Sequence, residues 1–236
     1  MKAMILAAGR GERMRPLTDR IPKPLIPVAG KPLIVWLLER LVRGGFSEIV
    51  VNVSHLGRLI ESALGDGGAY GARIAYSHEA EPLETAGGIA LALPLLGAGP
   101  FIVVNGDIHT DFPFEQLAAR AAAFDRLSAL AHLVLVDNPA HHPRGDFVLN
   151  DGRIDDAPGP RLTFSGIGVY DARLFTPVTP GSKHQLAALL REPIAARQVT
   201  GEHYVGDWTD VGTPQRLAAL ERRLAGASGG RQPRTM

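Results

Sequence analysis

The sequence predicts an α/β protein built on a doubly wound, mostly parallel sheet. Short apolar runs that fit buried strands alternate along the chain with segments of helical period, at about the spacing of βα units. Right-handed crossovers of this kind leave consecutive strands parallel. After residue 138 the strands follow one another closely, which predicts a small antiparallel β-hairpin extension. A chain of 236 residues, 45% of them hydrophobic, suits one large domain of this class.

Strands and helices alternate strictly in the first half of the chain. The run AMILAA at 3–8 is apolar throughout, as expected for a parallel strand that is buried on both faces. Helical periodicity follows at 32–45, where Pro32 lies near the start and a glycine pair ends the segment. Thr85 is the expected N-cap of a later helix. The other elements expected in this half are strands at 47–54, 72–79 and 100–107 and helices at 56–67 and 85–96.

The second half changes in style. The segment 146–156 reads as a hairpin around the Asp151-Gly152 turn. We expect one domain over 1–224 and a disordered tail over 225–236, because the tail has little to bury. The other elements expected here are helices at 114–124 and from residue 181, strands at 128–138 and 161–171, and a turn and helix at 208–224.

Composition limits the partners. The 25 basic and 24 acidic residues give a net charge of +1, which offers no general field for nucleic acid or an anionic membrane. Any anion site must therefore be local. The chain has no cysteine, so disulfides and thiolate metal sites are excluded. The first apolar run is too short for a signal peptide and no later run approaches a membrane span, so we expect a soluble, cytoplasmic protein.

The stretch LAAGRGERMRP at 6–16 directly follows the first expected strand. Ligands of open parallel sheets bind beyond the carboxyl ends of the strands. Gly9 and Gly11 let backbone N–H groups approach an anion, while Arg13 and Arg15 add cations that fork onto phosphate oxygens. The dinucleotide fingerprint does not fit, because Met14 stands where it needs a third glycine. The pattern predicts a polyphosphate site, with a plain surface turn as the alternative. The nucleotide contacts expected here are Leu6, Ala7, Ala8, Gly9, Gly11, Glu12 and Arg13.

Lys23 is the second candidate for a phosphate contact. It lies between Pro22 and Pro24, whose fixed φ angles stiffen the backbone that carries it. A lysine held in this way can aim its charge into the same edge of the sheet as the glycine-rich loop. The alternative is a solvated lysine in a rigid linker.

These motifs resemble those of one known family. LAAGRGERMRPLT and PKPLIPVAGKP are similar to the signature of sugar-1-phosphate nucleotidyltransferases, and the likeness continues in order through ETAGGI, VNGD, FSGIGVY and WTDVGT over nearly the whole chain. The resemblance implies a Rossmann-like nucleotidyltransferase fold. It also implies that a phosphate oxygen of a sugar 1-phosphate attacks the α-phosphorus of a nucleoside triphosphate, UTP being expected, and that pyrophosphate leaves.

The resemblance further implies that Asp107 and Asp210 bind Mg²⁺, for which carboxylate oxygens are suitable ligands. Lys23 would neutralise the α-phosphate or the sugar phosphate, and Arg13 with the nearby backbone would hold the departing phosphates. Each aspartate could instead cap the helix or turn that follows it. Arg13, Lys23, Asp107 and Asp210 are therefore the expected catalytic residues.

The remaining expected contacts concern the nucleoside and the sugar. Gly87 and Gly88 are expected against the nucleotide, with a permissive helix start as the alternative. The residues expected against the sugar are Glu84, which could also take a ribose hydroxyl, and Asn105, Gly145 and Asp146. A turn aspartate is the competing interpretation of Asp146.

Some features leave the substrate open. The family's Glu-Lys-Pro motif has no counterpart in IDDAPGP at 154–160, so Lys183 could hold the sugar phosphate or simply be solvated. The adjacent His141 and His142 are expected at the surface. Glucose 1-phosphate with UTP or dTTP, mannose 1-phosphate with GTP, and a catalytically silent nucleotide-sensing domain are the alternative functions.

Overall fold

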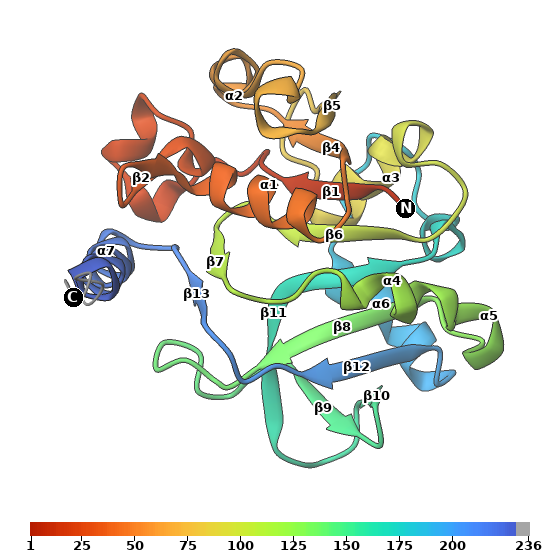
Figure 1. The fold of residues 1–236 in the computed structure, drawn as a ribbon. Coiled ribbons are helices and arrows are strands. Elements are labelled where there is room, and N and C mark those ends of the chain that lie inside the picture. The colour runs from red at the N-terminus through yellow and green to blue at the C-terminus, as the bar shows by residue number, and fades with distance from the viewer. Residues whose placement is uncertain (230–236) are drawn as a thin grey trace, which may run out of the picture.

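The computed structural model describes residues 1–229 and centres on one nine-stranded sheet (Figure 1). Strands that follow one another in the sequence are often not neighbours in the sheet, because the connections between them cross over its two faces. In spatial order the strands are β5 (Arg73–His78), β4 (Glu48–Val53), β1 (Ala3–Leu6), β6 (Phe101–Asn105), β11 (Arg161–Tyr170), β8 (Ala131–Val136), β12 (Val199–His203), β10 (Arg153–Asp155) and β9 (Phe147–Asn150).

The predicted fold class is confirmed. Strands β5, β4, β1 and β6 are parallel, as are β8 and β12, and β9 with β10 forms the expected hairpin. Strand β11 runs antiparallel between β6 and β8, so the later strands extend the main sheet. The sequence analysis missed β12, whose sequence VTGEH carries little apolar signal.

Helices cover both faces of the sheet. Side chains alternate along a strand, so Ile5 packs into one hydrophobic cluster and the adjacent Met4 into the other. Helices α1 (Leu33–Arg43), α2 (Gly57–Leu64) and α4 (Gln116–Ala122), followed by α5 (Phe124–Leu127), belong with the first face, whereas α3 (Glu84–Leu96) and α6 (Leu186–Ala195) belong with the second. Five short 3₁₀ turns complete this part: Glu12–Met14, Leu17–Asp19, Lys23–Leu25, Gly68–Tyr70 and Ala172–Phe175.

The start of α3 differs from the prediction. The helix begins at Glu84 with Leu83 as its N-cap, so the expectation that Thr85 is the cap was wrong. The backbone carbonyl of His184 accepts hydrogen bonds from the N–H groups of Ala86 (3.0 Å) and Gly87 (3.1 Å). A distant loop therefore satisfies amides that a side-chain cap would otherwise serve.

A short two-stranded ribbon brings the end of the chain to the sheet edge. Strand β7 (Ile108–Thr110) pairs antiparallel with β13 (Trp208–Asp210), and β2 (Pro27–Val28) pairs with β3 (Lys31–Pro32). Helix α7 (Pro214–Gly229) lies beside β13 and β2 (Figure 1). A small apolar cluster anchors it, formed by Val28, Leu33, Val211 and Leu220.

The expected tail over 225–236 is helical as far as Gly229, and its remaining residues lie outside the described residues. None of the helices in the part of the chain that the structure describes combines the length and hydrophobicity needed to cross a bilayer.

Candidate active site

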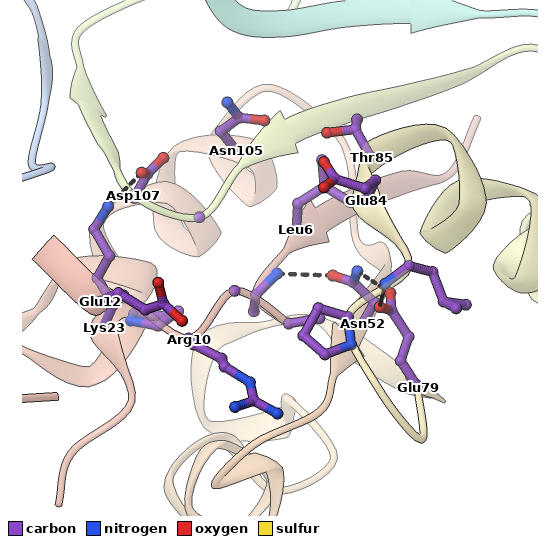
Figure 2. Close-up of a pocket in the computed structure, with 18 of the residues that line it drawn as sticks. Leu6, Arg10, Glu12, Lys23, Asn52, Glu79, Glu84, Thr85, Asn105 and Asp107 are labelled. Atoms are coloured by element: carbon purple, nitrogen blue, oxygen red, sulfur yellow. Dashed lines mark hydrogen bonds and ion pairs between the residues drawn. The ribbon is translucent and has the colours of Figure 1, made fainter. Parts of the chain in front are cut away.

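A cavity of about 690 Å³ opens at the carboxyl ends of β1 and β6 (Figure 2). This is the edge at which the sequence analysis placed the ligand. Its lining includes Leu6, Ala7, Ala8, Gly9, Arg10, Gly11, Glu12, Arg13, Lys23, Asn52, Glu79, Glu81, Glu84, Thr85, Asn105, Asp107, Lys183 and Gly212. All nucleotide contacts expected in the loop after β1 thus line the cavity, together with the sugar contacts expected at Glu84 and Asn105.

The glycine-rich loop folds tightly onto the segment that carries Lys23. Gly11 has a left-handed backbone (φ 65°), and a Cβ atom there would lie 2.8 Å from Thr18 Cγ2 and 3.1 Å from Lys23 Cβ. The Thr18 hydroxyl donates to the Gly11 carbonyl at 2.9 Å. Glycine is required at this position because both the backbone angle and the lack of space exclude a side chain.

Lys23 is held in a mostly buried ion pair at one end of the cavity. Its Nζ lies 2.5 Å from Oδ2 of Asp107, and 11% of its side chain is exposed, against 32% for Asp107 (Figure 2). The alternative of a solvated linker lysine is therefore wrong.

Asp210, at the end of the β7–β13 ribbon, lies close to the backbone of Asp107 although the two are distant in sequence. In the β7–β13 pair Asp210 stands opposite Ile108, and the N–H of Val211 donates to the carbonyl of Asp107 at 2.7 Å. Asp210 itself is not among the lining residues of the cavity, whereas Gly212, two residues further on, is.

Asp210 is also paired with cations. Arg216, in the first turn of α7, places Nη1 2.6 Å from one carboxylate oxygen and 2.8 Å from the other. His141 Nε2 lies 3.1 Å from Oδ1, so this surface histidine reaches the site. A Cβ on Gly212 would collide with Arg216 and lie 3.1 Å from Arg13 Nη2, so both guanidinium groups occupy the space beside that glycine. Sequence reasoning missed Arg216, and its position in the helix following WTDVGT was the available signal.

A chain of hydrogen bonds that the sequence did not predict lies at the other end of the cavity (Figure 2). The N–H of Ala7 donates to Asn52 Oδ1 at 2.7 Å, and Asn52 Nδ2 donates to Glu79 Oε1 at 2.6 Å. The second oxygen of Glu79 accepts from the N–H of Leu83 at 2.9 Å. Burial raises the pKa of Glu79 above its ordinary value, against the opposing effect of the hydrogen bonds from Asn52 and Leu83.

Comparison with known proteins identifies the family. The family model described as nucleotidyl transferase matches residues 2–145. The chain belongs to the nucleotidyl transferase family. A protein of Neisseria meningitidis serogroup B named N-acetylmuramate alpha-1-phosphate uridylyltransferase is 56% identical, over 96% of this chain and 99% of that protein. A protein of the same name from Caulobacter vibrioides is 39% identical, over 95% and 97%.

Solved structures show the same fold. A Bacillus anthracis protein described as a glucose-1-phosphate thymidylyltransferase superposes with a TM-score of 0.83 over 94% of both chains, at 21% identity. HddC from Yersinia pseudotuberculosis gives a TM-score of 0.75 at 20% identity, over 94% of this chain and 99% of its own. The nucleotidyl transferase fold therefore holds across most of the chain.

The donor set of this nucleotidyl transferase suits a magnesium ion. Asp107, in the turn before β7, and Asp210, at the end of β13, offer hard carboxylate oxygens, and each is paired with a protein cation. Residues 1–229 contain no cluster of three or more metal-ligating side chains. Two carboxylates are nonetheless enough for Mg²⁺, because it commonly keeps waters and takes its other ligands from substrate phosphates.

Gly87 and Gly88 lie inside α3 and are not among the lining residues of the cavity. A Cβ on Gly87 would collide with the Ser182 carbonyl, and one on Gly88 would lie 2.5 Å from Glu79 Oε1. Their lack of a side chain lets the helix pack against the loop at 182–184 and against the buried carboxylate. This differs from the expected reason, which was close approach to the nucleotide.

Gly145 and Asp146 also stand apart from the lining of the cavity. Asp146 Oδ2 accepts from the N–H of Phe164 at 2.8 Å, and Oδ1 lies 3.0 Å from His142 Nε2. The structure thus gives Asp146 the turn-stabilising role that was the competing interpretation. Gly145 is left-handed (φ 61°) and packed against the Arg161 backbone.

Lys183 does reach the cavity, from the loop before α6. Its ammonium lies 2.7 Å from Glu81 Oε2, in an exposed pair at the mouth. Arg10, which the sequence analysis did not select, also lines the cavity. The hydrogen bond and charge of Lys183, with a smaller contribution from the charge of Arg10, hold the pKa of Glu81 below its ordinary value.

Proposed function

We propose that this nucleotidyl transferase moves the uridylyl group of UTP to N-acetylmuramate α-1-phosphate, giving UDP-N-acetylmuramate and pyrophosphate. The observation that carries the proposal is the 56% identity to a protein of that name over 96% of the chain. The reaction would serve peptidoglycan recycling, in the cytoplasm where UTP is available. Its substrates are small molecules, and the composition gives no reason to expect nucleic acid or membrane as a partner.

The chemistry needs charge and alignment more than a base. The attacking phosphate oxygen is already anionic at neutral pH, so the bond to the α-phosphorus forms without removal of a proton, and pyrophosphate leaves with the electron pair of the broken P–O bond. Two anions must approach, and negative charge spreads over the transferring group in the transition state. Preorganised cations and backbone dipoles therefore account for most of the expected rate enhancement.

The residues of this chain divide that task. Arg13, with the backbone of Gly11 and Glu12, would hold the β- and γ-phosphates that depart. Lys23, rigidly held at the other side of the loop, would neutralise the α-phosphate or the sugar phosphate. Asp107 and Asp210 would hold Mg²⁺, which supplies further positive charge beside the phosphates when bound. Glu84 and Asn105 are left to accept or donate hydrogen bonds to sugar or ribose hydroxyls.

A guanylyl transfer is the second candidate, and one observation favours it. A mannose-1-phosphate guanyltransferase beta-A of Xenopus laevis is 32% identical over 91% of this chain, although the match covers 62% of that protein. Glucose 1-phosphate with UTP or dTTP is a further pair. A silent nucleotide-sensing domain is disfavoured because Arg13, Lys23 and Asp107 line one cavity. Asp210 lies nearby, since it pairs with Ile108, the residue after Asp107.

A pyrophosphate-release assay tests the proposal. The full chain with Mg²⁺ is given each of UTP, dTTP, CTP and GTP together with N-acetylmuramate, glucose or mannose 1-phosphate. We expect UTP with N-acetylmuramate α-1-phosphate to give the highest kcat/KM. A higher value for another pair would overturn the substrate assignment. If none of the pairs released pyrophosphate, the catalytic role would be overturned as well.

A further inference from the structure

Two buried polar residues connect two walls of the cavity through hydrogen bonds. Asn52 and Glu79 are 4% and 5% exposed, and within residues 1–229 their side chains form hydrogen bonds with each other and with two backbone amides. One of those amides, of Ala7, opens the glycine-rich loop. The other, of Leu83, immediately precedes α3. The pair therefore spans from the phosphate wall to the α3 wall.

Such a pair is a poor device for stability alone. A buried carboxylate loses its hydration, and replacing buried polar groups with apolar ones of similar volume is often neutral or stabilising. Both oxygens of Glu79 are occupied by donors, which leaves the carboxylate oriented rather than free. Glu79 thus serves to fix the positions of its hydrogen-bond partners more than to increase the free energy of unfolding.

The fixed position lies next to a strained residue. Glu84 has a left-handed backbone (φ 63°), and of the six non-glycine residues with positive φ in the described chain it alone lines this cavity. Such residues persist only where their surroundings over-determine the conformation. Here the N–H of Leu83 is held by Glu79, and the carbonyl of Leu83 accepts from the N–H of His184 at 3.0 Å.

Helix α3 packs closely against the side chains of Asn52 and Glu79. A Cβ on Gly88 would lie 2.5 Å from Glu79 Oε1 and 3.0 Å from Asn52 Nδ2, so α3 rests directly on the pair. A shift of either side chain would move the start of α3 and the loop at Ala7 together.

We propose that Asn52 and Glu79 are positioning residues, which set the separation between the glycine-rich loop and the left-handed turn at Glu84 so that a nucleoside triphosphate fits between them. The inference rests on the proposed function, because it assigns the nucleotide to this cavity. It predicts that nucleotide binding requires one amide and one carboxylate in this pair, whichever of the two positions each occupies.

Exchanging the amide and the carboxylate tests this directly. In Glu79→Gln an amide N–H₂ faces that of Asn52, and in Asn52→Asp two carboxylates face each other, so each single variant breaks the chain. In the double variant Asn52→Asp/Glu79→Gln the carboxylate at position 52 accepts from Ala7 and from the new amide, whose oxygen accepts from Leu83. All three hydrogen bonds can then form again, and only the one between positions 52 and 79 changes direction. Glu48→Gln is the matched control, at the opposite end of the strand that carries Asn52, in an exposed pair with Arg73.

Two readouts are needed, both on the full chain. Amide hydrogen exchange at Ala7 and Leu83 reports the chain of bonds, and calorimetric titration with Mg·UTP, without a sugar phosphate, reports its consequence. Each single variant should expose at least one of the two amides and weaken UTP binding by about tenfold, the effect of one unmet buried hydrogen bond. The double variant should recover both properties to within about threefold of the wild-type chain, and the control should match the wild type.

The outcomes separate this inference from the proposed function. Unchanged protection in the single variants, or lost protection with unchanged UTP affinity, would overturn the positioning role while the wild type still binds UTP. A double variant no better than the weaker single variant would do the same. A wild-type chain that binds no UTP would overturn the proposed donor and, with it, this inference.

Discussion

The ammonium of Lys23 lies 2.5 Å from Oδ2 of Asp107, so an expected phosphate contact and an expected magnesium ligand are paired with each other. Arg216 is paired with Asp210 in the same way, at 2.6 Å. Both carboxylates are thereby oriented by a protein cation. A divalent cation that binds them must compete with, or displace, these two side chains.

Removing the charge of Asp107 should abolish most turnover and leave the fold in place. In Asp107→Asn the amide keeps the shape of the side chain but is a poor ligand for Mg²⁺, and we expect kcat to fall about 100- to 1,000-fold. Steady-state pyrophosphate release measures the loss, and circular dichroism monitors the fold. Asp156→Asn, at an exposed loop position, is the control and should keep wild-type turnover. Activity of Asp107→Asn within a few fold of wild type would remove the metal role from this residue.

Lys23→Met should separate metal binding from catalysis. The apolar side chain has similar length, and its loss of charge removes both the competitor for Asp107 and a cation that repels the metal. We therefore expect tighter binding of Mn²⁺, followed by electron paramagnetic resonance, together with a kcat reduced about 100-fold. Arg216→Met should likewise tighten Mn²⁺ binding by freeing Asp210. Weaker Mn²⁺ binding in both variants would contradict the competition described above.

Local pattern predicted the first wall of the site well. The apolar run at 3–8 identified β1 and its carboxyl end, and the glycines and Arg13 that follow do line the cavity. Arg15 is not among the lining residues and forms an exposed ion pair with Asp19 instead. The prolines around Lys23 likewise indicated a rigidly held lysine, and the structure buries it. In each case neighbouring residues in the sequence carry the cause.

The parts that sequence reasoning missed depend on contacts between distant segments. No local signal pairs Asn52 with Glu79 or sets Arg216 on Asp210, and β12 forms because β8 and β10 flank it. Gly87 looked like a point of ligand approach, whereas its surroundings, contributed by the loop at 182–184, explain it as a packing position. Glycine patterns state that space is lacking but not which atoms occupy it.

Glu84→Gly should raise the free energy of unfolding and lower kcat/KM. Glycine removes the left-handed strain of about 1–2 kcal/mol but loses about 0.5–1 kcal/mol of chain entropy, so the free energy of unfolding should rise by up to about 1.5 kcal/mol. The lost carboxylate removes a hydrogen-bond acceptor from the cavity, and kcat/KM should fall about tenfold or more. Urea unfolding and the pyrophosphate assay measure the two effects.

Asp151→Gly provides the matched control for this variant. Asp151 is also left-handed (φ 47°), but it lies in the turn between β9 and β10 and is not among the lining residues of the cavity. It should gain stability in the same direction with kcat/KM unchanged. If Glu84→Gly keeps full kcat/KM, the carboxylate of Glu84 has no part in substrate binding and its strain requires another explanation.

Asp171 should give the protein an acid-sensitive contribution to stability. Burial acts to raise the pKa of Asp171, but hydrogen bonds and charge from Arg173 outweigh it, so the pKa lies below its usual value. Its carboxylate accepts from the backbone N–H and Nε of Arg173, both at 2.9 Å, and 8% of the side chain is exposed. Because the folded-state pKa is depressed, the stabilisation is complete above the unfolded pKa of about 3.9 and is lost as the pH falls through the folded value.

Asp171→Asn should therefore lower the free energy of unfolding by about 2 kcal/mol at pH 7 and by less near pH 3. Urea unfolding at both pH values measures the difference between variant and wild type. Asp125→Asn is the control, because Asp125 lies 3.4 Å from the same Arg173 but its side chain is 94% exposed, and it should change stability little at either pH. A deficit for Asp171→Asn that is equal at pH 7 and pH 3 would mean that the carboxylate contributes through its shape and hydrogen bonds alone, without its charge.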